Sequence, residues 1–368
     1  MSSADHHSPD ASEAPDSSRE QGERLLTVED LHVSFATEEG LVKAVDGVSF
    51  AVDRGEVVAI VGESGSGKTL TAMTLMGLTR SPNARFEGTA VYEGTELVNA
   101  SDGQLRRIRG AEIAMVFQDP MSSLDPVYRV GAQIVEQIRV HDGQISKAKA
   151  LDRAVELMER VGVPRAAERL RSYPHEFSGG MRQRVMIAMA LSCSPTLLIA
   201  DEPTTALDVT IQAQILNELR QLRQETNAGI ILVTHDLGVV ADIADRVIVM
   251  YAGRVVEQGT LDEIFYDPQH PYTWGLLGSI TRIDSDRAQR LPAIPGMPPS
   301  LMSPPRGCHF RPRCPHAFDR CTEVPPLIAR VPERPAQLDR CFLEPEQKRR
   351  LRQVGDQIGL ASAETVIS

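Results

Sequence analysis

Short apolar runs alternate with longer amphipathic stretches from about residue 25 to residue 265. The runs VVAIV (57–61), TLLIA (196–200) and GIILVT (229–234) have the length and the branched side chains of buried strands. Two further strand-like segments, LLTVEDLHVSF and VKAVDGVSFAV, precede them and are separated by a glycine-containing turn. The pattern therefore predicts several strands in the first two thirds of the chain.

Helices are predicted between these strands, because apolar residues recur there at helical spacing. In ALDRAVELMERVGVP the predicted apolar face consists of Leu151, Val155, Met158 and Val161. In the helix that follows TLLIA, the predicted face consists of Ile211, Ile215, Leu219 and Leu222. Asp208 is placed to cap the start of this second helix. Strands joined by helices predict an α/β fold with a parallel sheet and right-handed crossovers.

Composition and charge narrow the class of protein. The chain has 368 residues, enough for one large domain and a smaller one, and a net charge of −11 that argues against a nucleic-acid surface. No stretch approaches the roughly 20 apolar residues that cross a bilayer. Residues 1–24 lack the apolar core of a signal peptide and are expected to form a disordered tail. We therefore expect a cytosolic protein, in which structural disulfides are rare.

The segment GESGSGKT fits the phosphate-loop pattern G-x-x-x-x-G-K-[ST]. It lies between a predicted strand and a predicted helix, where backbone N–H groups and a helix N-terminus can surround phosphate oxygens. Lys68 is expected to reach the β- and γ-phosphates of a nucleotide, and Thr69 to ligate Mg²⁺. The predicted phosphate-binding residues are Gly62, Glu63, Ser64, Gly65, Ser66, Gly67, Lys68 and Thr69.

A second acidic motif, TLLIADEP, places two carboxylates at the end of a predicted strand. Asp201 is expected to hold Mg²⁺ through water, and Glu202 to orient or polarise the water that attacks the γ-phosphate. Phosphoryl transfer depends mainly on positioning and charge neutralisation, so these few groups suffice. The two motifs together predict an ATP-hydrolysing site.

The segment FSGGMRQR supplies a second helix N-terminus that can bind an anion, at Ser178, Gly179 and Gly180. One nucleotide hardly needs two such sites from the same chain. We therefore expect this segment to contact the γ-phosphate of ATP bound to a partner subunit.

These motifs together resemble the ATP-binding subunit of an ABC transporter, over residues 25–265 almost continuously. The resemblance implies a RecA-like core with an antiparallel β subdomain and a helical subdomain. It also implies that Phe35 stacks on adenine and that Gln118 touches Mg²⁺ and the attacking water. Asp208 is implied to cross a dimer interface, and His235 to contact the γ-phosphate. The chain departs from the usual L-S-G-G-Q signature at Phe177 and Met181 but keeps its phosphate-contacting centre.

Longer segments narrow the resemblance to the dipeptide and oligopeptide importers, and within them to the D-type ATPase. They include MVFQDPMSSLDPVYRVGAQIVE, SYPHEFSGGMRQRVMIAMAL, DEPTTALDVTIQAQIL and HPYTWGLL. This implies peptide uptake powered by a heterodimer with a second, related ATPase. It further implies two membrane permeases, an extracytoplasmic solute-binding protein and a location on the cytoplasmic face of the cell membrane. ATPases of nickel and haem importers share many of these motifs, so nickel and haem stay open as alternative solutes.

Two other classes of ATPase fit the sequence less well. Soluble ABC ATPases that act on DNA or ribosomes usually carry paired cassettes, long coiled coils or zinc inserts, none of which is visible in the sequence. A regulatory module that binds ATP without turnover would not need the intact Glu202 and His235.

The C-terminal part of the chain has a different composition. More than half of the 24 prolines lie between residues 286 and 345, which predicts a loop-rich module over residues 266–345 and a short tail over 346–368. Four of the five cysteines also lie here, in a spacing that is neither a zinc ribbon nor a ferredoxin pattern. From the residues alone, the cysteines indicate four thiolates and no particular metal.

The family resemblance implies that these cysteines hold a [4Fe–4S] cluster, with Cys308, Cys314, Cys321 and Cys341 as its ligands. His309 and His316 keep a zinc site as the alternative. The cluster is expected to stabilise the small module, and a redox-sensing role stays open. The fifth cysteine, Cys193, lies in a predicted helix and is expected to be buried.

Overall fold

A computed structural model describes residues 24–119, 123–205, 207–279 and 294–352. The predicted N-terminal tail lies outside these residues, apart from Arg24, which begins the first strand. The predicted C-terminal tail is described only as far as Arg352.

An eight-stranded sheet runs through the centre of the protein, in the order β11-β12-β10-β9-β3-β8-β7-β6. Its strands are β3 (Val57–Val61), β6 (Ile113–Val116), β7 (Leu197–Asp201), β8 (Gly229–Thr234), β9 (Arg246–Tyr251), β10 (Arg254–Thr260), β11 (Ile328–Ala329) and β12 (Leu338–Asp339). Strands β9, β3, β8, β7 and β6 are parallel. Because β3, β7 and β8 are buried at every residue, the prediction of buried strands in a parallel sheet is confirmed.

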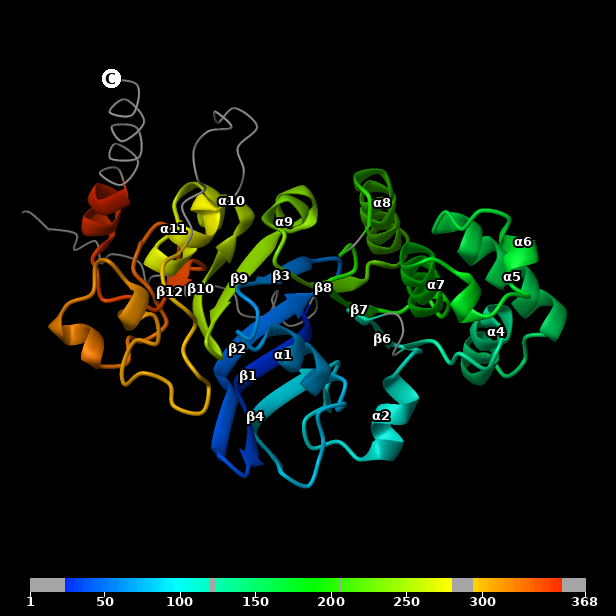
Figure 1. Cartoon of the computed structure of the whole chain (residues 1–368), viewed down its shortest axis with the longest axis horizontal. Coiled ribbons are helices and arrows are strands. Elements are labelled where there is room, and N and C mark those ends of the chain that lie inside the picture. Colours follow the sequence, from blue (N-terminus) through cyan, green and yellow to red (C-terminus); the bar gives the residue numbers. More distant parts are fainter. Residues whose placement is uncertain (1–23, 120–122, 206, 280–293, 353–368) are drawn as a thin grey trace, which may run out of the picture.

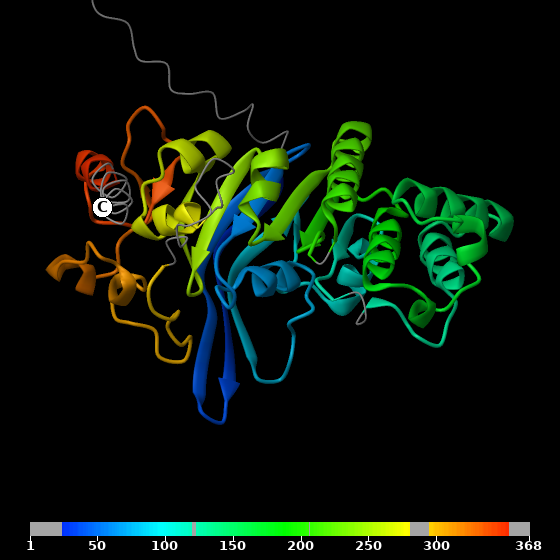
Figure 2. The same cartoon turned by 45° about the horizontal axis from the view of Figure 1, so that its top comes forward.

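A four-stranded antiparallel sheet, ordered β2-β1-β4-β5, lies beside the central sheet (Figure 1). Its strands are β1 (Arg24–Thr37), β2 (Gly40–Asp53), β4 (Ala84–Tyr92) and β5 (Thr95–Glu96). The side chains of Val28, Val48 and Tyr92 share one buried cluster with Ile60 and Met250 of the central sheet. Burial of this joint core holds the two sheets together. Figure 2 shows the β1–β2 hairpin projecting away from the core.

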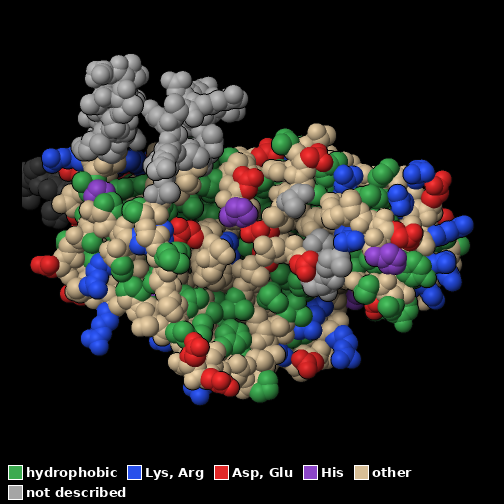
Figure 3. Space-filling view, viewed as in Figure 1, with side chains coloured by type: hydrophobic (Ala, Val, Ile, Leu, Met, Phe, Trp, Pro, Cys, Tyr) green, Lys and Arg blue, Asp and Glu red, His purple; other side chains and the backbone are tan. Residues whose placement is uncertain are grey.

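Helices surround the central sheet and form a separate arm at one end of the molecule (Figure 1). The helices are α1 (Lys68–Leu75), α2 (Asp102–Ile108), α4 (Val130–His141), α5 (Lys147–Arg160), α6 (Ala166–Arg169), α7 (Gly179–Leu191), α8 (Val209–Thr226), α9 (Leu237–Ile243), α10 (Leu261–Tyr266) and α11 (Pro271–Gly278), with the 3₁₀ turns η1 (Pro174–Glu176), η2 (Arg311–Arg313) and η3 (Asp319–Thr322). The arm consists of α4–α7 and matches the expected helical subdomain. Lys and Arg side chains gather over this end of the face shown in Figure 3, among acidic ones. In the part of the chain described, no helix is both long and apolar enough to cross a membrane.

Helix α5 buries part of the predicted face: Met158 and Val161 are fully buried, and Val155 packs half-buried against the core. Leu151 is 46% exposed, whereas Ala150, Ala154, Leu157 and Met158 are buried in the core of the helical arm. The prediction was partly wrong because it counted only large apolar residues. The close packing of α5 also uses two alanines, Ala150 and Ala154, so in the first half of the helix the buried stripe lies one residue before the predicted large residues. The predicted face of α8 is correct, since Ile215, Leu219 and Leu222 are buried.

The C-terminal region is loop-rich, as its proline content predicts, but the structure does not confirm an independent module. Leu338 and Asp339 of β12 pair with Gln258 and Glu257 of β10, so this region extends the central sheet. Phe310 is buried beside Tyr251 and Tyr272, which come from the sheet and from α11. The region therefore shares its core with the rest of the protein.

Candidate nucleotide-binding site

The phosphate-loop segment, residues 62–69, joins strand β3 to the N-terminus of α1. Gly62 has φ +150 and Gly67 has φ +101, values that side-chain-bearing residues rarely adopt. A Cβ atom at Gly62 would lie 2.2 Å from the carbonyl oxygen of Met250, and one at Gly67 would lie 2.5 Å from that of Ala44. The loop conformation and its close contacts therefore require glycine at both positions.

Lys68 is buried within this loop and folds back over it. Its Nζ donates hydrogen bonds to the carbonyl oxygens of Gly62, at 2.8 Å, and Glu63, at 3.0 Å. Burial lowers the pKa of Lys68, while the negative charges of Glu202, Asp201 and Glu63 act in the opposite direction. The ammonium group is therefore held at the centre of the loop, beside three carboxylates.

Thr69 and Asp201 meet across the end of the central sheet. The Thr69 hydroxyl donates a hydrogen bond of 3.1 Å to Oδ1 of Asp201, the last residue of β7. The pKa of Asp201 is raised to about 6, mainly by burial and also by the Glu202 charge, while the hydrogen bond from Thr69 and the charge of Lys68 act in the opposite direction. A hydroxyl and a carboxylate are oxygen donors of the kind that Mg²⁺ prefers, so this pair fits the predicted metal site.

Glu202 is the centre of a hydrogen-bonded cluster at the ends of adjacent strands. Its Oε1 lies 2.9 Å from Nδ1 of His235, which follows β8. Its Oε2 accepts hydrogen bonds of 3.0 Å from Gln118, which follows β6, and from the Thr205 hydroxyl. Because β6, β7 and β8 are parallel neighbours, their carboxyl ends bring these residues to one edge of the sheet.

The electrostatic surroundings keep Glu202 ionised. Burial raises its pKa, but the hydrogen bonds from His235 and Thr205 and the charges of His235 and Lys68 lower it by more. The resulting pKa lies below the usual value for a glutamate. A carboxylate with fixed partners and no proton can accept a hydrogen bond from water at neutral pH.

The other predicted site residues lie outside this cluster. Phe35 is part of β1, opposite Val42 and Ala84, and packs half-buried against the core shared by the two sheets. Ser178 caps α7 by accepting a hydrogen bond from Met181 N, at 3.3 Å. Asp208 caps α8 by accepting one from Ile211 N, at 3.1 Å, as its position in the sequence predicts.

Gly179 and Gly180 form the first turn of α7, directly after Ser178. The space next to Gly179 is open, because no atom lies within 4 Å of the position that its Cβ would take. The helix N-terminus formed by these residues is therefore open at Gly179.

Comparison with known proteins gives the family of the chain. Residues 45–205 match the family described as ABC transporter, and residues 256–321 match the family described as oligopeptide/dipeptide transporter, C-terminal region. The chain is 53% identical to the oligopeptide transport ATP-binding protein OppD of Salmonella typhimurium, over 88% of this chain and 95% of that protein. It is 52% identical to the dipeptide transport ATP-binding protein DppD of Bacillus subtilis, over 83% of this chain and 90% of that protein.

The chain belongs to the ABC transporter family. Among solved structures, a dimeric bacterial ABC transporter cassette superposes with a TM-score of 0.59 at 27% identity, covering 64% of this chain and 99% of the cassette. An ATP-binding subunit of an ABC transporter superposes with a TM-score of 0.54 at 31% identity, covering 65% of this chain and 91% of that subunit. The protein is accordingly an ABC-type ATPase, and the family and fold inferred from its sequence are confirmed.

The predicted iron–sulfur cluster of this ABC ATPase is wrong. Cys308, Cys314, Cys321 and Cys341 do line one small cavity of about 20 Å³, together with aromatic and apolar side chains. Across the described ranges, however, no group of three or more His, Cys, Asp or Glu residues is arranged to hold a metal ion. Burial raises the pKa of the Cys314 thiol to about 11 and that of the Cys341 thiol to about 12. The four cysteines therefore share a small cavity with mainly apolar neighbours.

The zinc alternative is overturned by the same observation. His309 is buried with its Nδ1 3.0 Å from the carbonyl oxygen of Ala252, and the His316 ring packs against Trp274. Cys193, which was expected to be buried, is half-buried, and burial raises the pKa of its thiol.

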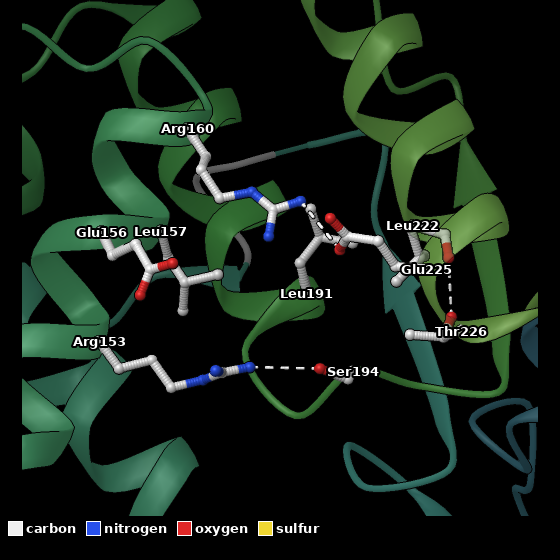
Figure 4. Close-up of a pocket in the computed structure, with 9 residues that line it drawn as sticks. All are labelled: Arg153, Glu156, Leu157, Arg160, Leu191, Ser194, Leu222, Glu225 and Thr226. Atoms are coloured by element: carbon white, nitrogen blue, oxygen red, sulfur yellow. Dashed lines mark hydrogen bonds and ion pairs between the residues drawn. The ribbon is translucent and has the colours of Figure 1, made fainter.

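A further cavity, of about 30 Å³, separates α5 from α8 (Figure 4). Arg160 of α5 faces Glu225 of α8, with 3.6 Å between Nη2 and Oε2, and Arg153 donates a hydrogen bond of 3.2 Å to the Ser194 hydroxyl. The cavity is far smaller than the few hundred Å³ that a nucleotide-sized ligand needs. The first contact joins α5 to α8, and the second joins α5 to the loop between α7 and β7.

Three residues that contact the site were missed by sequence reasoning. Thr205 binds Glu202, and its position in DEPTTALD was the available signal. Tyr272 accepts a hydrogen bond from the backbone N–H of Glu63 at 2.8 Å, and Arg313 forms an ion pair with the Glu63 carboxylate. The separation of 250 residues between Glu63 and Arg313 explains why no local pattern indicated this contact.

Proposed function

We propose that this ABC ATPase hydrolyses ATP at the site around Glu202 and thereby energises the uptake of dipeptides or oligopeptides by an ABC importer. The observation that carries the proposal is the convergence of the phosphate loop, Asp201, Glu202 and His235 at one sheet edge. The solute class is supported by relatives more than 50% identical to the chain that are peptide-transport ATP-binding proteins.

Binding of ATP is assigned to the phosphate loop, residues 62–69. Its backbone N–H groups and the N-terminus of α1 surround the phosphates, and Lys68 supplies a positive charge to the β- and γ-phosphates. Mg²⁺ supplies neutralisation of the phosphate charge when bound, and Thr69, Asp201 and Gln118 are the residues that would hold it. Phe35 is assigned to the adenine ring.

Hydrolysis is assigned to Glu202, because its lowered pKa keeps it ionised and its partners fix its position. The carboxylate accepts a hydrogen bond from the attacking water and turns the water's oxygen toward the γ-phosphorus. Gln118 and His235 each bind one oxygen of the Glu202 carboxylate, so they position this general base. Both residues are also assigned to the γ-phosphate side of the site.

The complementary surface is assigned to Ser178, Gly179, Gly180 and Asp208, which act on ATP bound to a partner subunit. The open N-terminus of α7 and the capped start of α8 support this assignment. We place the chain in a heterodimer with a related ATPase, on two permeases at the cytoplasmic face of the membrane, with a solute-binding protein outside. The nucleotide-binding domain extends over residues 25–265, and residues 266–345 form the C-terminal region of the importer ATPase.

Glu202→Gln tests the catalytic assignment in the purified transporter complex. We expect ATP binding to persist and ATP hydrolysis to fall about 100-fold or more, because the amide cannot act as a base. Glu87→Gln, an exposed strand residue, is the matched control and should hydrolyse ATP normally. Undiminished hydrolysis by Glu202→Gln would show that another group activates the water.

The solute and the partners are tested separately from the chemistry. Uptake of radiolabelled dipeptides and longer peptides is compared between a deletion strain and the same strain carrying the intact gene. Uptake of nickel or haem restored in place of peptide uptake would replace the peptide assignment. We expect two polytopic membrane proteins to co-purify with this chain. A soluble ABC ATPase would be purified without such partners.

A further inference from the structure

The second residue of the phosphate loop, Glu63, is held from outside the loop. The hydroxyl of Tyr272, on α11, accepts a hydrogen bond from the Glu63 backbone N–H at 2.8 Å. The Tyr272 side chain is fully buried, and its ring packs against Tyr251 with 4.6 Å between ring centroids. A rigid, buried side chain from the C-terminal region therefore fixes the main chain of the loop.

Arg313 holds the side chain of the same residue. Its Nη1 donates to Oε2 of Glu63 at 2.6 Å, and its Nη2 donates to Oε1 at 3.0 Å. This is the paired geometry in which arginine binds a carboxylate most strongly. The Arg313 side chain is only 5% exposed, so the ion pair is well shielded from solvent.

Every N–H group of the Arg313 guanidinium has an acceptor. Besides Glu63, it donates to the carbonyl oxygens of Pro295, at 2.9 Å, and Ile294, at 3.1 Å, and to the Tyr251 hydroxyl, at 3.3 Å. The hydrogen bonds to Glu63 raise the pKa of Arg313 above its usual value. Lysine cannot reproduce this set of contacts, because it lacks the planar fork of donors.

The segment that carries Arg313 is fixed to the nucleotide-binding domain at two other points. Leu301 accepts a backbone hydrogen bond from Lys43 of β2 at 3.1 Å, and His309 lies 3.0 Å from the carbonyl oxygen of Ala252, in the β9–β10 turn. The segment from Leu301 to Arg313 is therefore anchored beside the phosphate loop, and the backbone that carries Arg313 is fixed in place.

We propose that Arg313 is a positioning residue for ATP binding: together with Tyr272 it holds Glu63, and through Glu63 it sets the phosphate loop in its binding conformation. Lys68 donates to the carbonyl oxygen of Glu63, so a displaced Glu63 also displaces the lysine that is to meet the phosphates. The inference rests on the proposed function, since it assumes that residues 62–69 bind the phosphates of ATP.

The test compares ATP affinity among variants of the full-length chain by isothermal titration calorimetry with Mg²⁺ and ATP. Arg313→Gln is expected to raise the Kd for ATP about tenfold, a typical size for coupling between neighbouring sites. Arg313→Lys should fall between Arg313→Gln and the wild type. Arg306→Gln, an exposed arginine of the same segment, is the matched control and should bind ATP normally. Lys68→Ala should abolish binding.

The outcomes separate the two proposals. If Lys68→Ala binds ATP as well as the wild type, the phosphate site itself is misassigned. If Lys68→Ala fails to bind while a folded Arg313→Gln keeps the wild-type Kd, only the positioning role is overturned.

Glu63→Gln weakens the same ion pair from the side of the phosphate loop. This variant tests the proposal if Arg313→Gln does not fold. It should also raise the Kd about tenfold, and the double variant should be no weaker than either single variant. Steady-state kinetics should show a raised KM for ATP with kcat little changed, whereas loss of folded protein would lower kcat alone. A wild-type Kd in folded Glu63→Gln would likewise overturn the proposal.

Discussion

At the scale of single residues, the cluster around Glu202 includes Thr205, which was not singled out from the sequence although it lies within the DEPTTALD segment. Thr205 donates a hydrogen bond to the carboxylate oxygen that also accepts one from Gln118. Thr205→Val keeps the shape of the side chain and removes the donor. We expect kcat for ATP hydrolysis to fall about tenfold, corresponding to a loss of about 1.5 kcal/mol for one hydrogen bond to a charged group, with the Kd for ATP unchanged.

The control for this prediction is Thr89→Val, an exposed threonine on β4 that should leave kcat unaltered. A normal kcat in Thr205→Val would mean that Gln118 and His235 suffice to orient Glu202.

A second residue-scale prediction concerns Glu257, whose side chain is fully buried in β10. Burial raises its pKa to about 7, although hydrogen bonds from the backbone N–H groups of Gln269 and His270 oppose this. A carboxyl whose folded pKa exceeds its unfolded value stabilises the fold below the unfolded pKa, near 4.5, and loses that contribution as the pH rises to about 7.

Glu257→Gln removes this titration. We expect the stability of the variant, relative to the wild type, to improve steadily between about pH 5 and pH 7. The measurement is urea unfolding at several pH values in that range, with the exposed Glu333→Gln as control. His270, whose pKa burial lowers to about 3, is common to both proteins and cancels in the comparison. A constant difference across this range would contradict the raised pKa.

At the scale of elements, the central sheet was predictable from the apolar pattern of the sequence, whereas the packing of helix α5 was predictable only in part. Strands β3, β7 and β8 were predictable because a strand buried on both faces is a continuous apolar run. The phosphate loop and the Asp201–Glu202 pair were predictable because each lies directly after such a run. The buried face of α5 was predictable only in part: Met158 was expected to be buried, but Ala150 and Ala154 were not.

The corrected face of α5 gives a prediction for the stability of the arm. Leu157 is 4% exposed and Leu151 is 46% exposed. Leu157→Ala should lower the free energy of unfolding by about 2–4 kcal/mol, since it leaves a cavity in a packed core. Leu151→Ala should change it by about 0.5 kcal/mol or less.

Chemical denaturation monitored by circular dichroism measures both variants under the same conditions. Equal losses for the two leucines, or a larger loss for Leu151→Ala, would restore the face predicted from the sequence.

At the scale of the whole molecule, the C-terminal region joins the central sheet through contacts that span the chain. Its prolines predicted loops correctly, whereas the metal cluster predicted at its cysteines is wrong, because their spacing does not show what they surround. The pairing of β12 with β10 and the Arg313–Glu63 ion pair are long-range contacts between residues of ordinary type. Such contacts follow from the packing of the complete fold, so a single sequence carries no periodic signal for them.

A buried ion pair joins this region to the central sheet. Lys348 Nζ lies 2.7 Å from Oδ1 of Asp339, and the two side chains are 1% and 2% exposed. Burial raises the pKa of Asp339, with the charge and hydrogen bond of Lys348 acting against it. Residues 345–352 are helical and include Lys348, and Asp339 belongs to β12, so this ion pair joins the end of the described chain to the central sheet.

Lys348→Met should therefore lower the free energy of unfolding by about 3 kcal/mol, because it leaves the Asp339 carboxylate buried with less compensation. The double variant Lys348→Met/Asp339→Asn should recover part of this loss, since it removes the uncompensated charge as well. Arg349→Met, next in sequence and exposed, should be close to the wild type. Limited proteolysis should cleave the C-terminal region fastest in the single Lys348 variant. If that variant matched Arg349→Met in both measurements, the ion pair would contribute nothing to this junction, and apolar packing around Phe310 would account for it.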